Sequence, residues 1–107
     1  MGRQHPCETV GSFIAEKIME FAISDSPISK YLASNFDVFV IPMINPDGVI
    51  HGMSRTNMAG LDLNRHWGDN ILKELTPETM KIKQYIMNLS KVKRIKYMID
   101  LHGHGKK

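Results

Sequence analysis

Residues 36–48, FDVFVIPMINPDG, join a run of β-branched and aromatic residues to a turn sequence. The run at residues 36–41 stands between an asparagine and a proline, which predicts a short buried strand. The NPDG sequence at residues 45–48 predicts a turn, because Pro46 presets φ and Gly48 permits the positive φ that closes it. The sequence therefore predicts a strand whose carboxyl end leads into a polar turn.

The patterns on either side of this stretch predict helices and a second strand. Apolar residues at helical spacing predict a helix over residues 9–23, with a core-facing stripe of Val10, Phe13, Ile14, Ile18, Phe21 and Ala22. Residues 29–33 predict a short helix, and Thr76-Pro77-Glu78 begins another that continues to about Ser90. Residues 95–101 predict a strand that delivers His102 at its end. This order is typical of an α/β fold, in which ligands bind beyond the carboxyl ends of strands.

Composition excludes several classes of protein. The 107 residues allow one domain at most, with 42% hydrophobic and 23% charged residues as in ordinary soluble domains. The longest apolar stretch, residues 36–44, is interrupted and too short to cross a membrane, and the amino-terminal sequence does not resemble a signal peptide. The single cysteine excludes an internal disulfide. The net charge of +3 comes largely from residues 81–96 and 106–107, which are better explained by a solvated helix face than by nucleic-acid binding.

Two histidines and a glutamate form a candidate metal site. His5, Glu8 and His102 are the ligand types of a catalytic zinc site that keeps one position open for water. A His-x-x-Glu spacing alone is weak, and His102 alone is better explained by a histidine hydrogen-bonded at a strand end. His104 has a weaker claim, and Cys7 is interpreted as a packed thiol. Only the joint occurrence of these residues favours a metal site.

A second constellation supplies polar and cationic groups suited to an anionic substrate. It comprises Asn45-Pro46-Asp47-Gly48 and Asp62-Leu63-Asn64-Arg65. A guanidinium offers a planar fork for a carboxylate, although Arg65 alone is better explained by a salt bridge to Asp62 or Asp47. Asp47 and Asp100 are candidates for the carboxylates that orient the histidine rings.

Four motifs occur in order along the chain and together carry a family resemblance. They are HPCET at residues 5–9, NPDG at 45–48, GLDLNRHW at 60–67 and DLHGHG at 100–105. This pattern resembles the zinc carboxypeptidases of the carboxypeptidase A type, and looks most like the cytosolic carboxypeptidases. The resemblance runs from Gly2 to Lys106. Cys7 departs from the glycine that those enzymes usually carry between the two ligands.

The resemblance implies a mixed-sheet α/β fold, one Zn²⁺ ion and a role for each motif. His5, Glu8 and His102 are the implied zinc ligands, and the remaining implied site residues are Arg55, which polarises the scissile carbonyl, and Asn64 and Arg65, which hold the substrate's terminal carboxylate. Zinc-activated water then hydrolyses the bond to a C-terminal residue. The implied substrates are protein or peptide tails in the cytoplasm, with glutamate-rich tails such as those of polyglutamylated tubulin as the example.

The pattern also departs from that family. The family's general base is a glutamate far beyond the third ligand, and the residues after His102 include no acidic one. The strand that leads into the His-x-x-Glu loop is missing as well. We therefore expect residues 1–107 to be part of a catalytic domain that is incomplete at both ends and turns over negligibly by itself.

Two other functions stay open at this point. A zinc-dependent deacylase of the aspartoacylase and succinylglutamate desuccinylase type shares the His-x-x-Glu, the Asn-Pro turn and the Asp-Leu-Asn-Arg run. The features that favour a carboxypeptidase are Asp47-Gly48, Trp67 and His102-Gly103-His104. A non-catalytic zinc-binding module is the third possibility, because without a base no group takes the proton from the attacking water.

Overall fold

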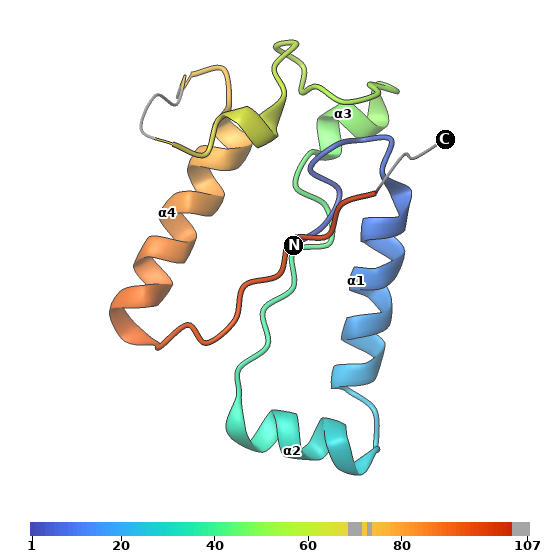
Figure 1. Ribbon diagram of the computed structural model, residues 1–107, viewed down its shortest axis with the longest axis vertical. Coiled ribbons are helices and arrows are strands. Elements are labelled where there is room, and N and C mark those ends of the chain that lie inside the picture. The colour runs from blue at the N-terminus through green and yellow to red at the C-terminus, as the bar shows by residue number, and fades with distance from the viewer. Residues whose placement is uncertain (69–71, 73, 104–107) are drawn as a thin grey trace.

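The computed structural model describes residues 1–68, 72 and 74–103, and it consists of helices joined by extended chain (Figure 1). The elements are α1 (Thr9–Ala22), α2 (Pro27–Asn35), α3 (Pro46–Ile50), the 3₁₀ turn η1 (Leu63–Arg65) and α4 (Pro77–Val92). None of the helices described is long and apolar enough to cross a membrane. His104, which the sequence raised as a weak ligand candidate, lies outside the described residues.

The helix predictions at residues 9–23 and 76–90 are confirmed by α1 and α4, and the short helix at 29–33 is part of the longer α2. Proline stands in the first turn of α2, α3 and α4, where a missing N–H costs nothing. At α2 the side chain of Ser26 also accepts a hydrogen bond from the Ser29 N–H.

The NPDG sequence begins a helix instead of closing a turn. The Asn45 side chain accepts from the Gly48 N–H and caps α3, so the predicted positive φ at Gly48 is wrong. Gly48 is needed for a different reason, a close approach. A Cβ there would lie 2.6 Å from Asn45 Oδ1 and 2.7 Å from Pro6 Cγ.

The two predicted strands are extended chain without a ladder between them. Residues 36–41 and 95–101 approach the amino terminus from below in Figure 1, and residues 1–3 lie where they converge. On one side the Gly2 N–H donates to Ile41 O at 2.9 Å and the Ile44 N–H donates to Gly2 O at 3.0 Å. On the other side the Leu101 N–H donates to Met1 O at 2.7 Å, and Gly2 and Leu101 form an isolated parallel bridge. The mixed sheet that the resemblance implied is therefore limited, among the described residues, to this junction.

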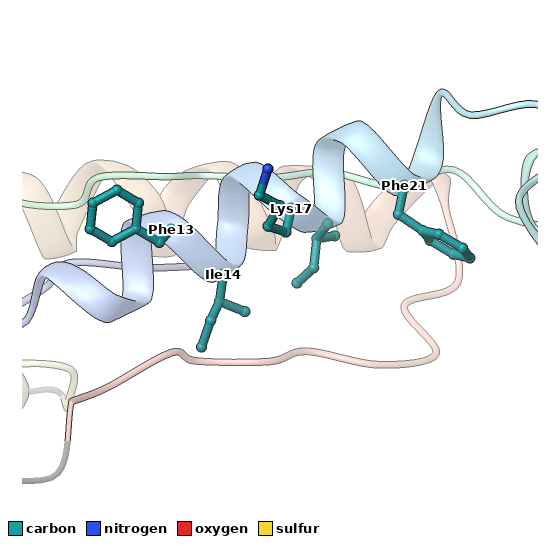
Figure 2. A pocket seen from close by; sticks show the side chains of 5 residues that line it. Phe13, Ile14, Lys17 and Phe21 are labelled. Carbon is teal, nitrogen blue, oxygen red and sulfur yellow. The ribbon is translucent and has the colours of Figure 1, made fainter.

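The apolar faces that the sequence predicted as core are largely exposed in the described chain. Phe13 is 63% exposed, Val38 48% and Phe39 50%, whereas the buried hydrophobic residues are Ala15, Ile44 and Leu63. Figure 2 shows Phe13, Ile14, Lys17 and Phe21 along α1, where they line a shallow hollow of about 370 Å³. A larger hollow of about 700 Å³ is lined by the two extended segments and by α4. Periodicity records which face is apolar, but burial also needs a second surface, and the described residues supply little of it.

Candidate metal centre

The loop that carries the first two candidate ligands begins at a left-handed residue. Arg3 has φ 52°, a conformation that is uncommon outside glycine, and its Nε donates to Pro6 O at 3.0 Å. The Cys7 N–H donates to Ser54 O at 3.0 Å, which ties the loop to the chain that follows α3. Cys7 itself is exposed, so the prediction of a packed thiol is wrong. Arg3 therefore marks the change from the paired residues to the ligand loop.

The structure brings His5, Glu8 and His102 together. Glu8 lies between the two rings: His5 Nδ1 is 2.9 Å from its Oε1, and His102 Nδ1 is 3.0 Å from its Oε2. The ring centroids are 5.0 Å apart, and one possible ligand atom from each residue lies within 4.8 Å of the others. His5 is 2% exposed, and His102 joins it from 94 residues beyond Glu8. The three side chains fit the donor set of a single divalent metal ion.

The outer nitrogens of both rings face carboxylates. His5 Nε2 lies 2.9 Å from Asp62 Oδ1, and His102 Nε2 lies 2.9 Å from Asp100 Oδ2. Metal-binding histidines usually donate their other N–H to a carboxylate, which fixes the tautomer and the ring orientation. The contact predicted for Asp100 is present. Asp47 is exposed on α3, and Asp62, considered from the sequence only as a partner of Arg65, makes the carboxylate contact with His5.

Glu8 receives enough donors to remain ionised. Burial raises its pKa, but hydrogen bonds from the Gly103 N–H, at 2.9 Å, and from the two histidines together lower it below the ordinary value. These contacts also explain why Glu8, at the N-cap of α1, makes no side-chain capping bond. The carboxylate is committed to the histidines instead of to the helix.

Asp62 links the histidine cluster to the predicted substrate residues. It accepts from Arg55 Nε at 2.7 Å and from the Asn64 N–H at 2.9 Å, in addition to its contact with His5. Burial opposes ionisation, yet the hydrogen bonds from His5, Arg55 and Asn64 lower the pKa of Asp62 to about 2. Arg55 is therefore connected to the candidate ligand His5 through the carboxylate of Asp62. Arg65 is exposed and bonds through Nη1 to Asn64 O, at 3.2 Å, and the salt bridge to Asp62 that was its alternative explanation is made by Arg55 instead.

Two buried asparagines hold the loops around this cluster, and sequence reasoning missed the role of their amides. Asn45 Nδ2 donates to Thr56 O at 3.1 Å while its Oδ1 accepts from Gly48. Asn57 Nδ2 donates to Leu75 O at 2.6 Å, and its Oδ1 accepts from the N–H groups of the residues at 59 and 61. Both side chains have all their carbonyl and amide groups engaged, as buried polar groups require.

Gln4 is a third buried amide that sequence reasoning missed. Its side chain is fully buried, accepts a hydrogen bond from the indole N–H of Trp67, and lies 3.2 Å from His102 Nε2. A single glutamine beside the His-x-x-Glu spacing gives no signal of these distant partners.

The sequence matches the family described as "Zinc carboxypeptidase" over residues 1–106. The chain belongs to this family. Among curated relatives of this zinc carboxypeptidase chain, "Cytosolic carboxypeptidase 2" of Homo sapiens is 40% identical over 105 residues, 98% of the chain and 12% of the human protein. "Cytosolic carboxypeptidase 3" of Bos taurus is 39% identical over 105 residues, 98% of the chain and 10% of the bovine protein. The chain therefore spans about an eighth or less of the curated relatives it matches.

Solved structures agree with the family assignment. The metallo-carboxypeptidase from Burkholderia cenocepacia aligns with a TM-score of 0.82 and 29% identity, over 96% of this chain and 27% of that one. The chain thus follows the α/β carboxypeptidase fold over most of its described length, although its own extended segments do not pair as a sheet.

Proposed function

We propose that His5, Glu8 and His102 bind one Zn²⁺ ion and that the chain forms the metal-binding part of a metallocarboxypeptidase. The observation that carries the proposal is the arrangement of the rings, whose Nδ1 atoms face Glu8 while their Nε2 atoms face carboxylates. Two histidines and a carboxylate leave a fourth position of a tetrahedral zinc ion for water or substrate. Zinc bound there lowers the pKa of water and polarises a carbonyl.

The residues linked through Asp62 are proposed to hold the substrate. Arg55 supplies positive charge beside the developing oxyanion, since its guanidinium keeps further N–H donors besides the Nε that contacts Asp62. Asn64 and Arg65, both exposed next to Asp62, are proposed to bind the terminal carboxylate of a peptide. Together these groups orient a C-terminal residue relative to the metal.

The proposed substrates are acidic protein or peptide tails in the cytoplasm. The net charge of +3 and the two exposed arginines of the site favour an anionic chain end. Glutamate-rich tails, such as those of polyglutamylated tubulin, are the example to test.

A second candidate is zinc binding without turnover by this chain. Among the described residues, the carboxylates in contact with the two rings are Glu8, Asp62 and Asp100, and each is occupied by a histidine. A general base must instead be free to take a proton from water. This arrangement of the described residues favours zinc binding without a free carboxylate to act as general base.

Zinc content of the purified chain, measured by mass spectrometry, tests the proposal. We expect near-stoichiometric zinc in the wild type and its loss in the His5→Ala and His102→Ala variants. His51→Ala is the matched control, because His51 is exposed outside the cluster and its variant should keep zinc. Absence of zinc from the wild type, or retention in both ligand variants, would refute the assignment.

Turnover is measured on the same zinc-loaded protein. Release of glutamate from a peptide that ends in a run of glutamates supports the carboxypeptidase, and zinc binding without release supports the second candidate. Hydrolysis of an N-acyl amino acid in place of the peptide would favour the deacylase that shares these motifs.

A further inference from the structure

We propose that Gln4 is a positioning residue that couples His102 to Trp67, and so joins the metal site to the loop that carries Asn64 and Arg65. The inference deepens the proposed function and rests on it for its biological meaning. The coupling itself is a property of the side chains and is testable without metal.

Gln4 is buried and held on several sides. Its side chain is fully buried, and both ends of its amide lie against polar atoms from distant parts of the chain. Its backbone O also lies 3.4 Å from Asn45 Nδ2, so the residue is fixed at both its backbone and its side chain. A buried amide held in this way has little freedom to rotate without losing a hydrogen bond.

Trp67 determines which way the Gln4 amide points. An indole N–H can only donate, so the atom of Gln4 that faces Trp67 must be Oε1. The donor Nε2 is then directed at His102 Nε2, 3.2 Å away. The orientation follows from the chemistry of Trp67.

His102 Nε2 has a second neighbour, the carboxylate of Asp100. Asp100 Oδ2 lies 2.9 Å from the same nitrogen and requires an N–H there, whereas Gln4 requires a lone pair. A metal ion held at Nδ1 of a neutral ring leaves the proton on Nε2, where it can be donated to Asp100. The N–H of His102 Nε2 and the NH₂ of Gln4 are then two donors that face each other. The amide must then rotate or shift, and the indole of Trp67 changes its partner.

The consequence is a link between the ligand set and the substrate loop. Trp67 follows η1, which contains Asn64 and Arg65 and ends two residues before it. A change at His102 is therefore transmitted to the segment proposed to hold the substrate carboxylate, and by thermodynamic reciprocity a change at Trp67 is transmitted to His102.

The test uses the indole N–H of Trp67, which gives one cross-peak in a ¹H–¹⁵N spectrum because the chain contains a single tryptophan. In metal-free protein we expect His102→Ala to move this peak and His51→Ala, the exposed control, to leave it in place. In a Gln4→Met background, which keeps a linear side chain without the amide, His102→Ala should no longer move the peak. A peak that ignores His102→Ala, or that responds equally in the Gln4→Met background, would overturn the proposal.

A reverse measurement keeps the test decisive if Gln4→Met does not fold. Trp67→Phe removes the donor at the other end, and we expect it to change the ring signals of His102 while leaving those of His51 unchanged. Unchanged His102 signals in a folded Trp67→Phe protein would overturn the coupling as well.

A zinc titration is the last measurement. Titration of Zn²⁺ into the wild type should move the indole peak, and the same titration of Gln4→Met should leave it in place although dialysis shows bound zinc. If the wild type binds no zinc, the proposed function fails while the metal-free arms still decide the coupling. If it binds zinc and the indole responds equally in both proteins, the coupling through Gln4 fails and the proposed function stands.

Discussion

The end of the molecule that holds the histidine cluster differs from the end formed by the two extended segments in what fills its interior. Around the cluster the fully buried side chains are mostly polar, among them Gln4, Asn45 and Asn57, and no described buried side-chain nitrogen or oxygen lacks a hydrogen-bond partner. In the extended segments the side chains are mostly apolar and exposed, with Phe39 at 50% and Tyr97 at 82%.

The difference shows how the two kinds of packing depend on the rest of a chain. An amide such as Asn45 is satisfied by a few directed hydrogen bonds to nearby loops, so a small set of residues completes it. Apolar burial is roughly proportional to area and needs a broad opposing surface. We call the end around the histidine cluster the site end, and the end formed by residues 36–41 and 95–101 the open end. We therefore expect the site end to be sensitive to single polar substitutions and the open end to tolerate substitutions of its apolar residues.

Asn45→Ala should have the largest effect. It leaves the Gly48 N–H and the Thr56 carbonyl without their side-chain partner in a buried position, at an expected cost of about 3 kcal/mol in the free energy of unfolding. Urea unfolding measures it. Asn88→Ala is the matched control, since Asn88 is exposed on α4 and its loss should cost about 0.5 kcal/mol or less. Equal losses in the two variants would contradict the polar character of the site end.

Acid should weaken the site end through Asp62. Its pKa is about 2 in the fold against an ordinary value of 3.8, so its stabilisation is present above 3.8 and is lost as the pH falls towards 2. The loss amounts to about 2 kcal/mol. The unfolding free energy of the zinc-free protein, measured across this pH range, should fall less steeply in Asp62→Asn. Asp25→Asn, at an exposed position, should behave as the wild type, and an unchanged slope in Asp62→Asn would exclude the mechanism.

The candidate ligands could be predicted from the sequence because their chemistry is local or carried by short motifs. His5 and Glu8 are three residues apart and His102 ends an apolar run, and their joint occurrence with the other motifs, not any one of them alone, indicated the candidate site. The partner of Asp62 could not be predicted in the same way. Its contact with His5 spans 57 residues, and only the path of the loop decides that Arg55, and not Arg65, lies beside it.

The longer helices were predictable, whereas the short helix α3 and the limited pairing of the strands were not, for a related physical reason. A helix satisfies its backbone within its own residues, so the patterns for α1 and α4 were sufficient. A strand needs a neighbour for its backbone groups. For residues 36–41 the described chain offers only the short pairing with Gly2, and the pattern alone does not reveal that limit.

Phe39→Ser should have a smaller effect than the polar substitutions. Phe39 is half exposed and meets Tyr85 edge to face at a centroid distance of 6.4 Å, so we expect a loss of about 1 kcal/mol, well below that of a fully buried phenylalanine. Urea unfolding measures the loss, and sedimentation should show less self-association than in the wild type, because an exposed apolar group is removed. A loss as large as that of Asn45→Ala would mean that the open end is packed as a core.

Lys93→Ala should have the smallest effect, although its ion pair with Asp37 joins the end of α4 to the extended segment at residues 36–41. Both side chains are about half exposed, at 51% and 58%, and exposed pairs of this kind contribute about 0.5 kcal/mol or less, with salt reducing the contribution further. Urea unfolding at low and high salt measures it, with Lys30→Ala as the matched control, because Lys30 pairs with Asp25 within one short segment. Similar losses in the two variants support an open end in which the end of α4 and this segment run independently. A Lys93→Ala loss several times that of Lys30→Ala, persisting in high salt, would instead mean that the ion pair holds these two parts together, because only a pair shielded from solvent keeps its strength against screening.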